Sequence, residues 1–358
     1  MKHQFLLLGL VLSVISTSAL GYGYLDALSK GSVMPGVDAV SHGFGGVSSV
    51  DVGGMNLFAN PAELVSFNPA INTSIGALIL KQTVDDGLGK HTLTYAGLGA
   101  SSIQLGFEAA NMDIALGIAK IRDYTYKGEY FFIDTNPEIL ISGFENLTIS
   151  GGTWESALGI GAQITPGTNL GIAGGYRFGE VSYKYNWHHF NESIPDSSET
   201  WTTDETGIAW RAGLSQAIGA STTAGVVYSS ATDNCPASVA GGIRVGNLGA
   251  FSPGFGVEAR IYDTEENKHW VANIFGGMHP EHNLYFRGAL VLSSRGGSES
   301  NATVGLAIGA TVDLGRTNIT GAFNYGNETR NEGVLGFPDA QSIQDIVTAF
   351  SFGATFDL

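Results

Sequence analysis

The chain ends on the stretch Val347-Thr-Ala-Phe-Ser-Phe-Gly-Ala-Thr-Phe-Asp-Leu358, which alternates between two kinds of side chain. Phe350, Phe352, Phe356 and Leu358 fall on one face of an extended strand, and small or polar residues fall on the other. An apolar outer face opposite a small, polar inner face is typical of a β-barrel that spans a membrane, with lipid outside and a polar lumen inside. We therefore expect this stretch to be the closing strand of such a barrel.

The same alternation recurs along most of the chain and predicts an all-β fold. The predicted strands are 72–81, 90–107, 112–126, 153–164, 169–186, 205–217, 221–229, 236–247, 253–262, 268–276, 283–293, 301–313, 317–325 and 346–357. Tight connections at 165–168, 218–221, 278–282 and 313–316 alternate with long polar loops at 127–152, 187–204 and 326–345. This order predicts a transmembrane antiparallel β-barrel of about 14 strands, with both chain ends on the periplasmic side.

Seven charged residues within the predicted strands fall on the small-residue face. They are Glu155, Arg177, Arg211, Arg244, Glu258, Arg260 and Arg287. An arginine facing lipid at the bilayer midplane costs about 2–4 kcal/mol, so we expect these charges to lie in the lumen. They are expected to pair with one another or with a plug, and direct contact with a ligand is the alternative.

The first 21 residues have the features of a secretory signal peptide. Lys2 precedes an apolar core at residues 5–15, which is too short to span a bilayer, and small residues follow it. No later apolar run is long enough for a membrane-spanning helix. Export and the barrel pattern predict a location in the bacterial outer membrane, in contact with its lipid.

Composition excludes several classes of protein. Only 14% of the residues are charged, and 51 of 358 are glycine, with apolar residues standing singly among small ones. A soluble α/β enzyme would instead show continuous apolar strands. The net charge of -16 argues against nucleic acid as a partner. Cys235 is the single cysteine, so no intramolecular disulfide can form.

About fifty residues between the signal and the first strand do not alternate. They contain a glycine-rich stretch with Gly36, Ala39, Gly43, Gly45 and Gly46, then Asp51, and then Asn60, Pro61 and Ala62. In these residues the chain resembles the FadL/OmpP1/TodX superfamily of outer-membrane barrels and the related PorV-like group. Asn-Pro-Ala recurs at residues 68–70, so the sequence leaves open which copy has the role that the motif has in the family.

The resemblance implies a domain organisation and a function. Residues 1–21 would be the signal peptide, residues 22–70 a plug or hatch inside the lumen, and residues 71–358 the barrel. The protein would then be a passive channel for uptake of long-chain fatty acids or other hydrophobic compounds, gated by the hatch. Candidate ligand contacts, by location only, are Phe44, Met55, Leu57 and Phe58.

Other functions are compatible with parts of the sequence. The PorV-like group implies an alternative, an outer-membrane scaffold for protein secretion or surface attachment, whose partner would be an exported protein. The run 43–54 lacks the ending of a phosphate loop. His188-His189 and the pair His279 and His282 could seed a metal site, but the sequence places no third ligand. No catalytic residues, metal or cofactor are predicted.

Overall fold

The computed structural model describes most of the chain. The described residues are 25–26, 31–33, 36–66, 68–85, 90–124, 126–134, 141–190, 195–232, 235–248, 252–263, 269–294, 303–330 and 342–358. The predicted signal peptide, residues 1–21, lies outside the described residues. Among the described residues, no helix has the length and apolar character needed to cross a membrane.

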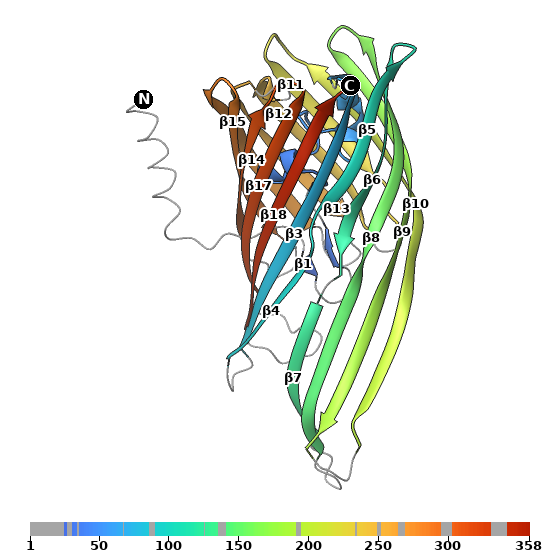
Figure 1. Ribbon diagram of the computed structural model, residues 1–358, viewed down its shortest axis with the longest axis vertical. Helices are drawn as coiled ribbons and strands as arrows, with labels where there is room; N and C mark the ends of the chain where they lie inside the picture. The colour runs from blue at the N-terminus through green and yellow to red at the C-terminus, as the bar shows by residue number, and fades with distance from the viewer. Residues whose placement is uncertain are drawn as a thin grey trace, which may run out of the picture.

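Antiparallel strands form a closed 14-strand barrel (Figure 1). The strands are β3 (Ala70–Asp85), β4 (Lys90–Leu98), β5 (Ser101–Ala109), β6 (Met112–Asp123), β7 (Tyr126–Asp134), β8 (Ile141–Thr165), β9 (Thr168–His189), β10 (Ser197–Ala217), β11 (Thr222–Ser229), β12 (Ala237–Gly246), β13 (Gly254–Asp263), β14 (His269–Glu281), β15 (Leu284–Ser294), β16 (Thr303–Asp313), β17 (Thr317–Arg330) and β18 (Ser342–Asp357). Strands β4 and β5 both pair with β3, and strands β6 and β7 both pair with β8. The pair β4 and β5 therefore counts as one strand of the barrel wall, and so does the pair β6 and β7. The wall closes where β18 pairs with β3 along its whole length. The predicted fold and strand number are confirmed.

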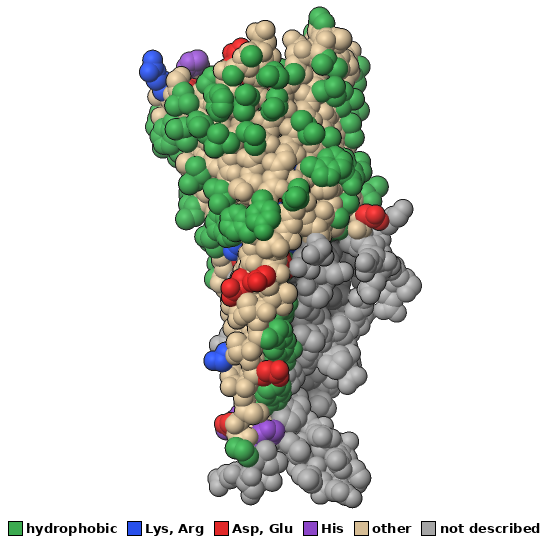
Figure 2. All heavy atoms as spheres, turned by 90° about the vertical axis from the view of Figure 1, so that its right-hand side faces the viewer, with side chains coloured by type: hydrophobic (Ala, Val, Ile, Leu, Met, Phe, Trp, Pro, Cys, Tyr) green, Lys and Arg blue, Asp and Glu red, His purple; other side chains and the backbone are tan. Residues whose placement is uncertain are grey.

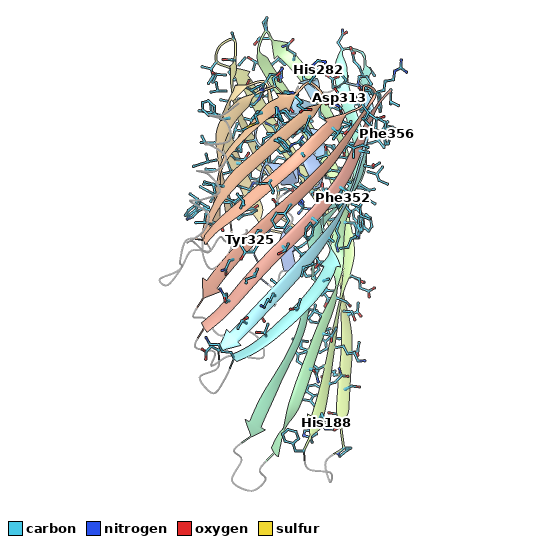
Figure 3. The ribbon with its side chains drawn as sticks, turned by 60° about the vertical axis from the view of Figure 1, so that its left-hand side comes forward. His188, His282, Asp313, Tyr325, Phe352 and Phe356 are labelled. Carbon is cyan, nitrogen blue, oxygen red and sulfur yellow. The ribbon has the colours of Figure 1, made fainter. Side chains whose placement is uncertain are left out.

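Large apolar side chains form a belt around the outside of the barrel (Figure 2). Members of this apolar belt include Ile75, Ile103, Leu158, Ile172, Ile208, Phe255, Ile274, Ile308 and Phe352. Ile208 is 78% exposed and Phe352 is 64% exposed, whereas their chain neighbours Ala209 and Ser351 are 0% exposed. This outward apolar, inward small arrangement is the surface of a barrel that spans lipid. Figure 3 shows Phe352 and Phe356 in the belt on β18.

Beyond the belt, part of the wall continues as a narrow sheet that we call the extension. It consists of β7 with residues 141–152 of β8, residues 180–189 of β9 and residues 197–206 of β10. Figure 3 places His188 near the tip of the extension, whereas His282 and Asp313 lie at the opposite end, where the short turns are.

The structure corrects the sequence prediction of loops at 127–152, 187–204 and 326–345. Part of each range is strand, namely β7 and the start of β8, the end of β9 and the start of β10, and the end of β17 with the start of β18. The reason is that a sheet outside lipid needs no apolar outer face, so polar residues such as Lys184 and Asp204 are exposed there and the apolar alternation is lost. The turn predicted at 278–282 is also shorter, because β14 continues to Glu281 through a register shift.

The inside of the barrel holds residues 36–66, which we call the inner segment. It contains the helix α2 (Ala39–Gly43) and the 3-10 helices η1 (Asn56–Phe58) and η2 (Pro61–Ser66). The side chain of Asp38 caps α2 by accepting a hydrogen bond from Ser41 N at 2.8 Å. Helix α2 contacts β15 to β18, and η2 contacts β8, β9 and β10. Upstream, β1 (Leu25–Asp26) pairs with β2 (Gly31–Val33), and β2 pairs with β6.

The apolar belt gives a direct test of the membrane orientation of β9. Replacing Ile172, which is 59% exposed in the belt, by arginine places a charge in lipid. We expect the free energy of unfolding to fall by about 2–4 kcal/mol, measured by urea titration of the protein folded in phosphocholine vesicles. Glu180→Arg on the same face of β9, but in the extension, should leave it unchanged. Equal losses for the two variants would contradict the assignment of the belt.

Candidate functional site

The turn Asn60-Pro61-Ala62 is held inside the barrel by the Asn60 side chain. Asn60 is fully buried, and its Nδ2 donates to the carbonyl of Ser49 at 2.7 Å and to that of Leu214 at 3.4 Å. Its Oδ1 accepts from Ala62 N at 3.0 Å, which closes a local Asx turn. Asn60 therefore joins two parts of the inner segment to the wall strand β10.

Three wall glycines face this turn. Gly161 of β8 pairs with Gly171 of β9, which in turn pairs with Gly213 of β10, so they form one row across the wall. We call them the glycine row. A Cβ at Gly171 would overlap the backbone of Pro61, and a Cβ at Gly213 would overlap the Asn60 amide. Glycine is required here because backbone lies directly on backbone.

The glycine row distinguishes the two copies of Asn-Pro-Ala. The first copy, residues 60–62, is buried against the row. In the second copy, Asn68 and Pro69 are exposed, and the carbonyl of Pro69 accepts from Leu358 N at 3.0 Å where the barrel closes. Only the first copy therefore lies in the lumen.

A second anchor of the inner segment is the carboxylate of Glu258 on β13. Its Oε2 accepts from Ser48 N at 2.8 Å, Ser49 N at 2.6 Å and Ser49 Oγ at 2.7 Å. Arg260, two residues along β13, donates to the carbonyl of Gly46 at 2.9 Å and to Glu258 at 3.2 Å. The side chains of Glu258 and Arg260 thus bind N–H and C=O groups of the inner segment that lie outside its helices.

The glycines of the sequence motif lie at close contacts or unusual backbone angles. Gly43 lies against the Arg287 side chain and the backbone of Gly309. Gly45 and Gly46 have φ angles of 72° and 82°, which side chains other than glycine rarely adopt. The stretch from α2 to the Glu258 anchor therefore depends on glycine for its path.

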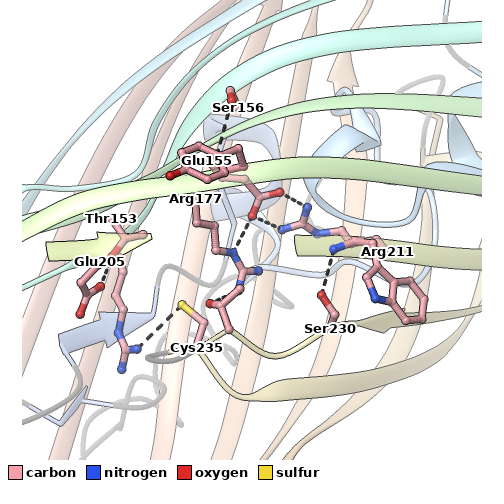
Figure 4. A network of polar contacts seen from close by, with 12 residues as sticks. Thr153, Glu155, Ser156, Arg177, Glu205, Arg211, Ser230 and Cys235 are labelled. Atoms are coloured by element: carbon pink, nitrogen blue, oxygen red, sulfur yellow. Dashed lines mark hydrogen bonds and ion pairs between the residues drawn. The ribbon is translucent and has the colours of Figure 1, made fainter. Parts of the chain in front are cut away.

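Glu155 on β8 lies between two arginines (Figure 4). Its Oε2 accepts from Arg177 Nε of β9 at 2.9 Å and from Arg211 Nη2 of β10 at 2.9 Å, and its Oε1 accepts from Arg211 Nη1. Arg177 Nη1 also donates to Thr232 at 2.8 Å. Glu155 is 0% exposed. These are the strong, charge-assisted bonds that a buried carboxylate needs.

The two remaining predicted lumen charges are also buried. Arg244 donates to the carbonyl of Gly246 at 2.7 Å. Arg287 bonds to Thr311, and its guanidinium lies 5.4 Å from the ring centroid of Phe44 and 5.3 Å from that of Tyr285. Cation–π contacts of this kind are strongest where water is excluded.

The four candidate ligand contacts fall into two groups. Phe44 is packed edge-on against Phe275 at 5.9 Å, and Leu57 packs against the wall at Gly159. Met55 and Phe58 instead line a cavity of about 110 Å³ between the inner segment and the wall. The cavity wall also includes Val37, Val47, Ile121, Arg177, Arg211, Cys235, Pro236, Arg260 and Tyr262. Asp38, Ser41, Ser48, Ser229 and Ser238 complete the polar part of the lining, which is therefore a mixture of apolar, hydroxyl and charged groups.

The inner face of the extension carries four stacked aromatic rings, which we call the aromatic ladder. Trp201 of β10 stacks on Tyr183 and on Tyr185 of β9, with ring centroids 5.2 Å and 5.3 Å apart, and Tyr185 stacks on Trp187 at 5.5 Å. Interplanar angles of 10–16° make the rings nearly parallel. Because the ring faces cover one another, ring edges are what the ladder presents to a ligand.

A buried apolar cluster and then a group of polar side chains lie between the ladder and the cavity region. Leu147 and Ile149 of β8 pair with Tyr185 and Tyr183, and they form one buried cluster with Val181 and Tyr124. Below this cluster, Glu205 accepts hydrogen bonds from Tyr124 and, at 2.6 Å, from Thr153. The cavity follows next along the wall, where Arg122 Nη1 lies 3.8 Å from Cys235 Sγ.

The barrel wall divides between β4 and β7. At Gly99 and Ala100 the ladder to β3 is interrupted, and Ser101 Oγ accepts from Gly76 N at 3.3 Å in place of a backbone group. Lys120 of β6 donates to the carbonyl of Leu98 at 2.8 Å and to Asp123 at 2.7 Å at this point. Within the described residues no backbone pairing joins β4 to β7, and β2 pairs with β6 at the apex of the gap.

The histidines proposed as seeds of a metal site have other partners. His188 Nδ1 lies 2.7 Å from Asp196 Oδ2 at the tip of the extension, and this hydrogen bond lowers the pKa of the Asp196 carboxyl. His279 contacts the ring of Tyr285. In the part of the chain that the structure describes, no three His, Cys, Asp or Glu side chains gather as metal ligands would.

Comparison with known proteins rests on structure. No protein-family model and no curated protein matches the sequence. The toluene transporter TodX of Pseudomonas putida is similar with a TM-score of 0.66 at 12% identity, covering 91% of this chain and 99% of that chain. This protein has the FadL/TodX fold. The toluene transporter TbuX of Ralstonia pickettii (TM-score 0.59, 12% identity) and a Pseudomonas aeruginosa FadL homologue (TM-score 0.60, 10% identity) each cover 91% of this chain and 99% of their own.

Several site features of this FadL/TodX fold were not identified from the sequence. The glycine row was missed because its members resemble the many other strand glycines until the register of β8, β9 and β10 is known. Trp187 and Trp201 lie in a range predicted as loop, 187–204, whereas Tyr183 and Tyr185 lie in the predicted strand 169–186. Their two-residue spacing in the polar run 180–189 is the signal that could have revealed a ladder.

Docking of the inner segment on the glycine row can be tested at Gly171. We expect Gly171→Ala to lower the free energy of unfolding by about 1–3 kcal/mol, because the added methyl overlaps Pro61 and the turn must move. Urea titration measures this loss. Gly174→Ala, on the same strand with no atom within 4 Å of the added methyl, is the matched control and should change little. A similar loss in both variants would mean that the strand, and not the docked turn, is affected.

Replacing one carboxylate oxygen of Glu155 by an amide nitrogen should lower the free energy of unfolding more than Gly171→Ala does. Glu155→Gln keeps the shape but leaves two buried guanidinium groups without a counter-charge, so we expect a loss of about 3–5 kcal/mol in the same titration. Asp85→Asn removes the partner of Lys90, whose side chain is 73% exposed, and should cost less than about 1 kcal/mol. A loss of unfolding free energy for Glu155→Gln as small as that of Asp85→Asn would mean that the Glu155 network does not stabilise the barrel.

Proposed function

We propose that this protein is an outer-membrane channel through which long-chain fatty acids or other hydrophobic compounds pass by diffusion, with the inner segment as its hatch. The observation that carries the proposal is the sequence of apolar groups on the inner face of the wall, from the aromatic ladder through the buried cluster of Leu147, Ile149 and Val181 to the cavity at Met55 and Phe58. A channel for a hydrophobic ligand needs such apolar groups, because each step across an aqueous lumen would otherwise expose the ligand to water.

The ladder suits an apolar ligand better than a sugar. Sugars stack on free ring faces, but here the faces of Trp201 are covered by Tyr183 and Tyr185. The ring edges that remain favour the face of an aromatic ring or the side of an alkyl chain. Long connections face the cell exterior in bacterial barrels, so the ladder would be the first surface that a ligand meets.

The cavity has the dimensions of a small ligand or of one part of a larger one. Its volume is about 110 Å³. For comparison, an apolar protein cavity of about 150 Å³ binds benzene. A single-ring compound would therefore nearly fill it, whereas a long alkyl chain would extend from it toward the extension. The structural neighbours TodX and CymD are a toluene transporter and a monoaromatic hydrocarbon channel, which supports the first of these ligands.

Two routes out of the cavity are consistent with the structure. The gap between β4 and β7 is a sideways route into the membrane, because no backbone pairing joins its two edges in the described residues. The second route requires the inner segment to move, and its anchors at Asn60 and Glu258 resist such movement. We favour the sideways route, since it leaves both anchors intact.

Uptake by intact cells tests the channel and the ladder together. Cells that produce the protein should take up radiolabelled toluene or oleate faster than cells without it. Trp201→Ala should slow uptake at low ligand concentration by about 2- to 10-fold, because each lost ring contact is worth about 0.5–1.5 kcal/mol. His188→Ala, on the outer face of β9, is the control and should not change the rate. Equal uptake with and without the protein would refute the channel.

A further inference from the structure

Strand β10 has a free edge in the extension. Its pairing with β9 runs without interruption from Ser197 to Gln216, but its pairing with β11 begins only at Arg211. Residues 197–204 are exposed without exception, and within the described residues no strand pairs with this part of β10 on the side away from β9. Figure 1 shows β10 at the margin of the extension.

The register identifies which backbone groups point out of this edge. The backbone N–H and C=O groups of Trp210 both point toward β11. Its N donates to Ser230 Oγ at 2.9 Å, and its carbonyl accepts from Ser230 N at 2.9 Å. Pairing with β9 shows no register shift along β10, so every second residue repeats this orientation. Ser198, Thr200, Thr202, Asp204 and Thr206 therefore direct N–H and C=O groups away from β9.

The free edge lacks three of the usual protections against strand addition, because residues 197–206 contain no lysine, no proline and no β-bulge. Their charged side chains, Glu199, Asp204 and Glu205, are all acidic and therefore oppose acidic strands. The segment is instead rich in threonine, which favours the extended conformation. An exposed, regular edge of this kind is a template for an added strand.

Charge selects the kind of strand that can be added. Exposed side chains on this part of the extension include the carboxylates of Glu180, Asp196, Glu199 and Asp204, against one lysine, Lys184. Figure 2 shows acidic side chains along the narrow part of the molecule. A second copy of the chain, with its net charge of -16, would bring like charges together along the edge, which is unfavourable. A segment with lysine or arginine would be attracted.

We propose that the free edge of β10, residues 197–206, binds an extended basic segment of another polypeptide, which adds as a strand to the extension. Backbone hydrogen bonds to the even-numbered residues would supply affinity, and Glu199 and Asp204 would select basic side chains. This interaction does not require the channel function, because the edge consists of backbone groups in the plane of the sheet, whereas the ladder ring of Trp201 projects from the inner face of the same strand.

The experiment uses the full chain in detergent and a fluorescent synthetic peptide, Lys-Thr-Ile-Thr-Lys-Thr-Ile-Lys, followed by fluorescence anisotropy. We expect saturable binding that weakens with salt, together with slower amide hydrogen exchange in residues 197–206. Thr202→Pro removes one outward N–H without removing a bond to β9, and should weaken binding by roughly tenfold. Thr202→Val keeps the N–H and favours the strand, so it is the matched control and should bind within about twofold of the original chain.

Two further variants distinguish the possible occupants. Asp204→Lys should weaken binding of the basic peptide and favour a version in which glutamate replaces each lysine. Thr200→Pro repeats the edge test at a second position, in case Thr202→Pro does not fold. Equal binding by the proline and valine variants would overturn the proposal. So would exchange protection outside residues 197–206, or self-association of the chain that Thr202→Pro abolishes, which would make a second copy the occupant.

Discussion

The rest of this structure depends on the rule that a backbone N–H or C=O group in lipid must have a hydrogen-bond partner within the protein. The rule requires the pairing of β18 with β3 that closes the barrel. It also explains where the wall is incomplete. The division between β4 and β7 begins at Gly99. The free edge of β10 lies in the extension beyond the apolar belt, where water can replace the missing partner.

Inside the barrel, the dominant constraint is the fit between two backbones. The turn at Asn60 and Pro61 reaches the wall only because Gly161, Gly171 and Gly213 present no side chains there. Polar anchors then fix the position that the glycines permit, since Asn60 bonds to the carbonyl of Leu214 and Glu258 bonds to Ser48 and Ser49. Beside this packing lies the cavity at Met55 and Phe58, whose lining includes Arg177, Arg211 and Arg260.

The sequence predicted the barrel well because a wall strand in lipid must alternate, and residues such as Ile208 and Ala209 record that alternation directly. It failed at the extension, where Lys184 and Asp204 face water and no periodic contrast remains. The site was harder to predict. The inward direction of Glu155 or Arg177 follows from the alternation of side chains along one strand. Contacts between strands, such as the glycine row and the aromatic ladder, depend instead on the register between the strands, which a single sequence does not specify. The division of the candidate contacts, with Phe44 and Leu57 packed and Met55 and Phe58 at the cavity, likewise depends on the path of the inner segment.

The position of the inner segment in the chain has a consequence for biogenesis. Residues 36–66 precede every wall strand, and the two strands that meet at the final seam, β3 and β18, are the first and the last of the wall. The glycine row lies on β8, β9 and β10, in the middle of the wall, so the surface that receives the Asn60 turn can form while the seam is still open. The inner segment can thus dock on β8, β9 and β10 before β18 pairs with β3, so enclosing it does not require it to enter a closed barrel.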